Sequence, residues 1–259
     1  MSPLNFRKLQ DKHVLVIGGT SGIGRAVSEG ALAAGAKATV SSSSQARVDS
    51  AVSELRSVYP DGQITGVAVD LAQAATLEAD LDRLFTSAAA ANGTVNHVVF
   101  TAADSLSLGG LDSVTVELVS KAAHMRMVVP VVLAKVAARH LPRERQSSLT
   151  LTSGSVADKP AKGWAVIAYM GGGLVSLTRA LAVDLAPVRV NVVQPGFVDT
   201  PLWKMSEEEK RATIAAVEKK LLTAHFGEAA DVAEAYLWLL KDNNATGTVA
   251  KTDAGFLLT

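Results

Sequence analysis

The sequence predicts an α/β protein: a single doubly wound, Rossmann-like domain over residues 1–259, with a central parallel sheet of about seven strands and helices on both faces. Short apolar runs alternate with helical patterns along the whole chain. A glycine loop joins the first apolar run to the first helix, and no repeat, low-complexity tract or linker divides the chain. With 259 residues, 48% of them hydrophobic, the chain can bury one large core.

Composition argues against several classes of function. The 25 basic and 25 acidic residues balance and form no basic block, so neither a nucleic-acid nor an anionic-membrane partner is expected. The absence of cysteine excludes disulfides, thiol catalysis and cysteine metal sites, and the five scattered histidines suggest no metal centre. No signal-peptide pattern and no run of about 18 apolar residues occurs, so we expect a cytoplasmic protein.

The first half of the chain alternates strongly between strand and helix patterns. Four buried residues at 14–17 predict the first strand, and the helix after it places Ile23, Val27, Ala31 and Leu32 on one face. Further strands are expected within 35–41, 64–69 and 95–101, and helices at 44–58 and 73–91.

The second half continues the alternation. A long helix is expected at 113–140, bent at Pro130 because proline cannot donate to the preceding turn. Strands are expected at 148–152, 188–193 and 247–252, and helices at 164–186 and 231–240. Another helix opens at Ser206, whose three following glutamates suit a helix N-terminus.

The loop between the first strand and helix has the spacing G-x-x-x-G-x-G at Gly18, Gly22 and Gly24. Glycines let a backbone approach a pyrophosphate, and the helix N-terminus supplies free N–H groups. The loop therefore predicts a dinucleotide site, to which Thr20, Ser21 and Ile23 also belong. The alternative is a tight turn in a domain that has lost its ligand.

With these elements placed, the chain resembles the short-chain dehydrogenase/reductase family over essentially its full length. The matching landmarks are the glycine loop, Asp70-Leu71 and the stretches 177–182, 188–196, 198–200 and 247–255. The resemblance implies that Asp70, beside Leu71, holds the adenine amino group. It also implies that the stretch with Pro195, Gly196, Val198 and Thr200 binds the nicotinamide carboxamide. The alternatives are a helix cap for Asp70 and a simple turn for Pro195-Gly196.

The cofactor is expected to be NADP(H). An NAD enzyme places an acidic residue after the second strand, where this chain has Ser41, Ser42 and Ser43 with Arg47 nearby. Hydroxyl donors and cations suit a 2′-phosphate. Arg25 is a second cation within possible reach, and a helix cap at Ser43 or Ser44 is the alternative use of these serines.

The chain departs from the family where catalysis is expected. After the fourth strand, Thr101, Ala102 and Ala103 stand where the family has Asn-Ala-Gly; we assign them to the cofactor site. Aligned with the family's Ser, Tyr, Lys and Asn are, in that order, Gly154, Ile167, Gly171 and Arg126. Ordinary ketone reduction needs a proton donor, so this chemistry is disfavoured.

Other side chains are candidates for the reaction: Arg126, Ser153, Ser155 and Trp164, with Thr152 near the old serine position. Arg126 could instead form a salt bridge or contact a phosphate, and Trp164 could stack on an aromatic substrate or seal the core. Tyr169 lies two residues after the old tyrosine position, which turns it by roughly 200° away from the site, so we expect it to pack in the core or at an interface. Glycines 171–173 would leave room for a bulky ligand.

Further motifs point to one branch of the family: Arg126 on the long helix and the stretches 100–104, 151–155, 160–164, 169–172, 232–236 and 246–248. In these motifs the chain resembles a divergent branch, the fungal reductase/Diels–Alderases of bridged indole alkaloid biosynthesis. That resemblance implies NADPH-dependent reduction of an iminium in a bulky secondary-metabolite intermediate, followed by a guided cyclisation. An Asp implicated in those enzymes is absent here, where Ala161 and Lys162 stand. A redox-neutral cyclase or isomerase and a non-catalytic nucleotide-binding protein stay open as alternatives. The helical stretches 113–140 and 164–186 correspond to the family's association surface, so a homodimer or homotetramer is expected.

Overall fold

The computed structural model describes residues 4–259 except 105, 107 and 204, and it contains a sheet of seven parallel strands. The strands lie in the order β3-β2-β1-β4-β5-β6-β7. Their bounds are β1 His13–Ile17, β2 Lys37–Ser42, β3 Ile64–Ala68, β4 His97–Phe100, β5 Ser148–Thr152, β6 Arg189–Pro195 and β7 Val249–Thr252. The predicted fold class is thus confirmed.

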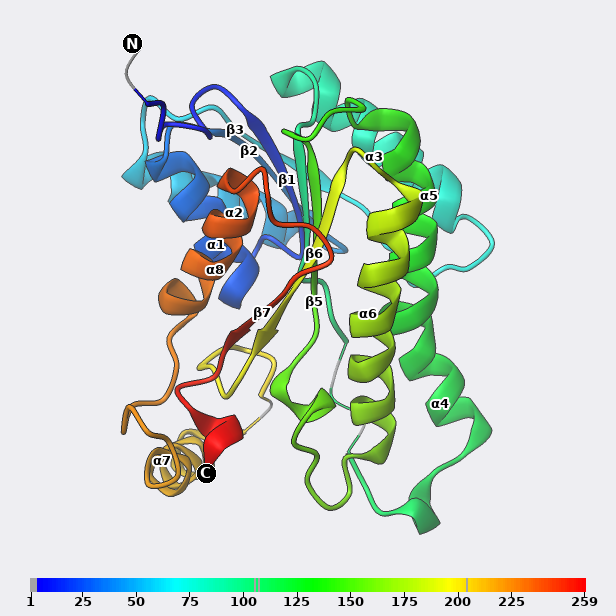
Figure 1. The fold of residues 1–259 in the computed structure, drawn as a ribbon, viewed down its shortest axis with the longest axis vertical. Helices are drawn as coiled ribbons and strands as arrows, with labels where there is room; N and C mark the ends of the chain where they lie inside the picture. Colours follow the sequence, from blue (N-terminus) through cyan, green and yellow to red (C-terminus); the bar gives the residue numbers. More distant parts are fainter. Residues whose placement is uncertain (1–3, 105, 107, 204) are drawn as a thin grey trace.

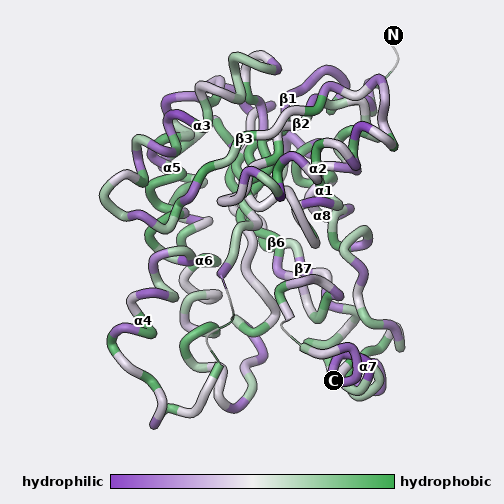
Figure 2. The backbone as a smooth tube through the Cα atoms, turned by 180° about the vertical axis from the view of Figure 1, so that it is seen from behind, coloured by the Kyte–Doolittle hydropathy of each residue, from purple (hydrophilic) through white to green (hydrophobic). Residues whose placement is uncertain are grey.

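Helices cover both faces of the sheet (Figure 1). One face carries α1 (Gly22–Ala33), α2 (Gln45–Val58) and α8 (Ala229–Lys241). The other carries α3 (Leu77–Asn92), α5 (Val129–His140) and α6 (Ala165–Asp184), which bury the largest hydrophobic cluster against the strands. Figure 2 shows the hydrophobic segments gathered along the sheet and the helices beside it.

The strand order reverses between β1 and β4, and this reversal positions the site. Ile17, at the end of β1, pairs with Ser41 on one side and with Phe100 on the other. The loops that follow these strands therefore meet at one edge of the sheet. In open α/β sheets, ligands bind in the crevice at such a switch point.

The predicted long helix at 113–140 is wrong in its details. A short 3-10 turn, η1 (Leu111–Ser113), precedes α4 (Val116–Ala123), and a π-helical segment, η2 (His124–Val128), separates α4 from α5. In η2 the N–H of Val129 bonds to the carbonyl of His124, five residues earlier. Pro130 follows at once and offers no N–H to the carbonyl four residues before it, so the widened turn lies where the bend was expected.

Two further helices, α7 (Glu207–Glu218) and α6, follow the positions expected from the sequence. At α7 Ser206 forms the expected N-terminal cap: its hydroxyl accepts from Glu209 N, while the Glu209 carboxylate accepts from Ser206 N. Among the described residues, α6 alone is long and apolar enough to cross a membrane, by length and composition only. It packs along β6 and buries Ile167, Met170 and Leu174.

Candidate active site

The glycine loop follows β1 and is packed too closely for larger residues. Gly18 has φ +91°, and a Cβ atom there would stand 2.5 Å from the backbone nitrogen of Ala102. A Cβ atom at Gly24 would stand 2.4 Å from Thr101 Oγ1. The loop is held by the Ser41 carbonyl, which accepts from the N–H groups of Gly18 (2.9 Å) and Gly19 (3.2 Å).

The N-terminus of α1 is left open for an anion. Ser21 is the N-cap, but its side chain makes no capping hydrogen bond, and the first turn contains no acidic residue. The first backbone N–H groups and the positive end of the helix dipole thus have no capping side chain among the described residues. This cradle fits the pyrophosphate of a dinucleotide.

The segment after β6 returns to the same loop. A Cβ atom at Gly22 would stand 3.1 Å from the Thr200 side chain, so Thr200 lies directly against the glycine loop. Gly196 lies against Asp253, where a Cβ atom would approach the Asp253 Cα to 2.7 Å. Val198 is buried and pairs with Gly227 in an isolated bridge. The residues expected around the nicotinamide are thus beside those expected around the pyrophosphate.

The residues expected around the adenine half also lie at the carboxyl edge of the sheet. Asp70 is exposed, and its Oδ1 accepts from Ala72 N at 3.0 Å in a local turn. The carbonyl of buried Leu71 accepts from His124 Nε2 at 2.7 Å. This bond ties the π segment η2 to the adenine side of the site.

The serines after β2 divide into different roles. Ser41 is fully buried, and its hydroxyl has no partner among the described residues, so its backbone carbonyl is its link to the loop. Exposed Ser43 accepts from the guanidinium of Arg47 at 2.9 Å, while Ser44 caps α2. Arg25 instead pairs with Glu54 at 2.5 Å. Ser43 and Arg47 are therefore the pair that geometry brings together beside Ser42.

Of the four positions that carry the family's catalytic residues, three have no titratable side chain, and the fourth has Arg126, whose guanidinium does not give up its proton. Gly154 follows β5, Ile167 is buried in the first turn of α6, and Gly171 lies one turn later. A Cβ atom at Gly171 would stand 3.2 Å from Ser153 Oγ, and Ser153 donates to the Gly171 carbonyl at 2.9 Å. The space in which a lysine would begin is thus closed by Ser153.

Two of the sequence-based expectations need correction or qualification. Thr152 does not face the substrate space, because its Oγ1 lies 2.6 Å from Phe100 O and 2.7 Å from the hydroxyl of buried Tyr236, on the α8 side of the sheet. Tyr169 is 64% exposed, so it does not pack in the core.

Ser155 opens a short 3-10 turn, η3 (Ser155–Ala157), and is 8% exposed.

Arg126 comes from η2 and is 8% exposed. Its Nη1 forms an ion pair with an Asp104 carboxylate oxygen, and its Nη2 donates to the Asp104 backbone carbonyl at 2.8 Å. Burial lowers the pKa of the Arg126 guanidinium, which nevertheless stays charged at neutral pH. Arg126 thus forms a salt bridge, as one alternative expected, and its partner is Asp104, which was not among the predicted site residues.

An aromatic wall packs around the segment that follows β6. It consists of Trp164, Trp203, Phe197, Phe226 and Phe256, and no periodicity in the sequence links them. The rings of Trp164 and Trp203 lie 6.3 Å apart, and Trp203 stacks on Phe197 at 6.0 Å. The Trp203 indole nitrogen donates to Val198 O at 3.0 Å, which connects this wall to the nicotinamide segment.

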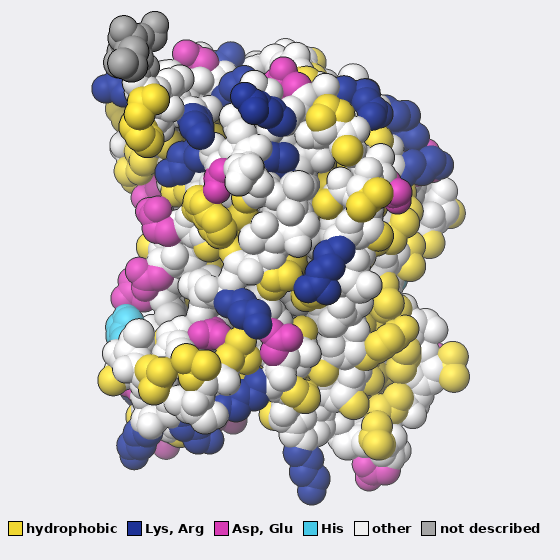
Figure 3. Space-filling model, in the orientation of Figure 1, with side chains coloured by type: hydrophobic (Ala, Val, Ile, Leu, Met, Phe, Trp, Pro, Cys, Tyr) yellow, Lys and Arg dark blue, Asp and Glu magenta, His cyan; other side chains and the backbone are white. Residues whose placement is uncertain are grey.

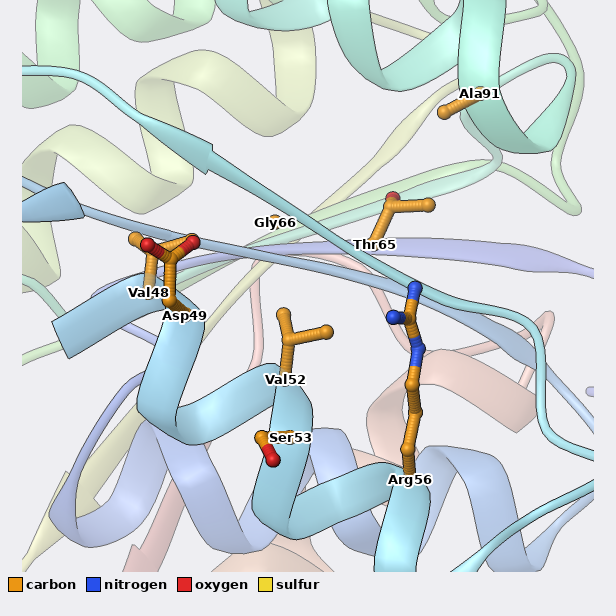
Figure 4. A pocket seen from close by; sticks show the side chains of 8 residues that line it. All are labelled: Val48, Asp49, Val52, Ser53, Arg56, Thr65, Gly66 and Ala91. Atoms are coloured by element: carbon orange, nitrogen blue, oxygen red, sulfur yellow. The ribbon is translucent and has the colours of Figure 1, made fainter. Parts of the chain in front are cut away.

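Two cavities lie outside the glycine loop. A groove of about 610 Å³ lies between α2 and the edge strand β3, lined by side chains that include Val48, Arg56 and Thr65 (Figure 4). None of its lining residues belongs to the glycine loop, so we do not assign it to the cofactor. A second cavity, of about 460 Å³, is lined by Pro160 and Ala161 and also by Phe256 of the aromatic wall.

Known proteins resemble this chain over nearly its whole length. A family model described as an SDR-like Rossmann domain matches residues 5–259. The short-chain dehydrogenase/reductase ATR9 of Stachybotrys chlorohalonatus is 39% identical over 251 residues, covering 96% of this chain and 98% of its own. The short-chain dehydrogenase/reductase malC of Malbranchea aurantiaca is 39% identical over 255 residues, covering 96% of both chains.

Solved structures agree with these sequence matches. The structure of the MalC reductase/Diels–Alderase from Malbranchea aurantiaca superposes with a TM-score of 0.92 at 39% identity, covering 98% of this chain and 99% of that one. A small-chain dehydrogenase in complex with NADPH superposes with a TM-score of 0.75 at 26% identity, covering 96% and 99%.

Proposed function

The chain belongs to the short-chain dehydrogenase/reductase family and is an oxidoreductase, and we propose that it uses NADPH to reduce a cationic C=N bond in a bulky secondary-metabolite intermediate. We further propose that the same cavity guides an intramolecular Diels–Alder cyclisation of the product, as the name of the MalC reductase/Diels–Alderase states for that protein. Residues 1–259 act as a single domain in this proposal.

The observation that carries the proposal is a glycine loop and an uncapped helix N-terminus that fit a pyrophosphate, in a chain without the family's proton donors. Hydride addition to a ketone builds negative charge on oxygen, and losing the donor that stabilises it costs about 10²–10⁴ in rate. Hydride addition to an iminium forms a C–H bond, moves the π electrons onto nitrogen and yields a neutral amine. No proton is transferred, so Gly154, Ile167 and Gly171 are compatible with this step.

The remaining residues have positioning roles in the proposal. The bound nicotinamide supplies the hydride. Trp164 offers a face on which a planar substrate stacks, and Ser153, while donating to Gly171, keeps lone pairs that accept from a substrate N–H. Ser155 follows two residues later in the chain. Arg126 fixes the position of Asp104 through their ion pair.

NADPH is preferred over NADH in the proposal because the Ser43–Arg47 pair presents hydroxyl and guanidinium donors where an acid would bind a ribose hydroxyl. The small-chain dehydrogenase that superposes on this chain was solved with NADPH.

We propose a homodimer or homotetramer associated through the α4–α5–α6 side. Exposed apolar side chains gather there: Val116, Val128, Val131, Tyr169 and Val183. Figure 3 shows hydrophobic side chains running down this side of the molecule. A cytoplasmic location is part of the same proposal and agrees with the absence of cysteine.

The proposal is tested by incubating the purified protein with NADPH or NADH and a panel of iminium and ketone substrates, while the absorbance of the reduced cofactor is followed. Cofactor oxidation with iminium substrates supports it. Product formation without oxidation favours a redox-neutral cyclase or isomerase, and cofactor binding without any product favours a non-catalytic nucleotide-binding protein.

A further inference from the structure

The ion pair between Arg126 and Asp104 is oriented, with its positive end inside the protein. The Arg126 side chain is 9% exposed, whereas that of Asp104 is 29% exposed. The guanidinium donates hydrogen bonds to two groups of Asp104, the carboxylate and the backbone carbonyl. The carboxylate is therefore fixed on the open side of the pair, and it follows the cofactor-side stretch 101–103 at the end of β4.

Other carboxylates near the site have partners of their own. Asp199 pairs with Lys210 at 2.8 Å, and Asp158 pairs with Lys251 at 2.8 Å. Both ammonium groups are on the surface, so these pairs are screened by water. Asp253 accepts from Gly255 N at 2.9 Å in a turn. Asp104 differs from them because a buried cation holds it.

We infer that the Asp104 carboxylate is the counter-charge for a cationic substrate, with Arg126 as the positioning residue that holds it. A cation in the pocket meets the carboxylate first and the guanidinium beyond it, so the interaction with the pair is attractive although the pair is neutral. This inference rests on the proposed function, in that it takes an iminium as the ligand. It explains how a buried arginine is compatible with a cationic substrate.

The test compares two probes of the same shape, the cation N-methyl-dihydroisoquinolinium and its neutral lactam, N-methyl-dihydroisoquinolinone. Binding to the NADP⁺ complex is measured by calorimetry, so no turnover occurs. The variants are Asp104→Asn, which keeps the shape and removes the charge, Asp104→Glu, and the control Asp112→Asn. Asp112 is an exposed carboxylate in the η1 turn of the same connection and has no ion pair among the described residues.

We expect the wild-type protein to bind the cation more tightly than the lactam. Asp104→Asn should weaken binding of the cation about tenfold, while lactam and NADP⁺ affinities change less than about twofold. Asp104→Glu should restore part of the preference, and Asp112→Asn should leave it unchanged.

Equal weakening of both probes in Asp104→Asn would show that the residue is merely structural and would overturn the inference. A wild-type protein that binds the cation no better than the lactam, including one that binds neither, overturns it as well. A third outcome separates the two proposals: the cation binds preferentially in an Asp104-dependent manner, but the protein never oxidises NADPH with it. This result would refute the proposed reduction and would still support Asp104 as the counter-charge.

Discussion

The Ser153 hydroxyl donates to the Gly171 carbonyl at 2.9 Å, and a Cβ atom at Gly171 would stand 3.2 Å from that same hydroxyl oxygen. The Ser153 side chain therefore forms a hydrogen bond with the α6 backbone and also lies in the space beside Gly171. The family's lysine position thus packs closely against the segment that follows β5. Because four positions differ from the family, a single reverting substitution would not rebuild the usual catalytic set.

This contact predicts coupling between the two residues. Replacing a helical glycine by alanine stabilises a protein by about 1 kcal/mol when the site has room. In a Ser153→Ala background, we expect Gly171→Ala to raise the free energy of unfolding by about 0.5–1 kcal/mol. In the wild-type background the increase should be smaller, because the new methyl group meets the Ser153 hydroxyl. Urea unfolding of the four proteins measures the coupling, and additive changes would contradict it.

Cofactor choice should depend on Arg47. We expect Arg47→Ala to raise the KM for NADPH about tenfold with little change for NADH, because only NADPH carries the 2′-phosphate. Arg83→Ala, which removes a cation that is paired with Asp80 on the surface, is the matched control. An equal loss with both nucleotides would refute this role for Arg47.

The sequence could predict those parts of the fold and site that depend on neighbouring residues. The glycine loop, the Ser206 cap and the alternation of strands with helices follow from local spacing. The Arg126–Asp104 pair and the contact of Trp164 with Trp203 join segments that no periodicity relates. Thr152 was misassigned although alternation along β5 places it and Ser153 on opposite faces, a signal that could have been used.

Arg189 should be a main contributor to stability. Its guanidinium donates to the carbonyls of Arg145, Leu239 and Leu240 at 2.6–3.0 Å, and so caps the end of α8 from inside the protein. Burial lowers its pKa to about 10, so it stays charged at neutral pH.

We expect Arg189→Met to lower the free energy of unfolding by about 3 kcal/mol, because buried carbonyls lose a charged donor. Arg189→Lys should recover part of this, since one ammonium cannot reach all the carbonyls. Denaturant titration measures both effects; a change below about 1 kcal/mol for Arg189→Met would be inconsistent with this capping role.

Stability should also fall in acid through His97. Burial, with a smaller contribution from Arg189, lowers the pKa of His97 from 6.5 to about 3. Below pH 6.5 the unfolded chain binds a proton that the folded chain does not, so stability is full above that pH and decreases towards about pH 3.

The decrease due to His97 approaches about 1.4 kcal/mol per pH unit. His97→Gln removes the titrating ring, so we expect a shallower decline in a series of urea titrations between these pH values. Buried His13, whose pKa is also lowered, would continue to contribute in the variant. Identical slopes for the two proteins would show that His97 is not the group that titrates.

The central claim is that the site reduces a cationic C=N bond in preference to a ketone. The most direct measurement follows transfer of deuterium from NADPH labelled at the transferred position to N-methyl-dihydroisoquinolinium or to tetralone, a ketone of similar shape. We predict deuterium at the former iminium carbon, with kcat/KM at least about 10² above that for the ketone. Comparable rates for the two substrates, or reduction of the ketone alone, would contradict the account.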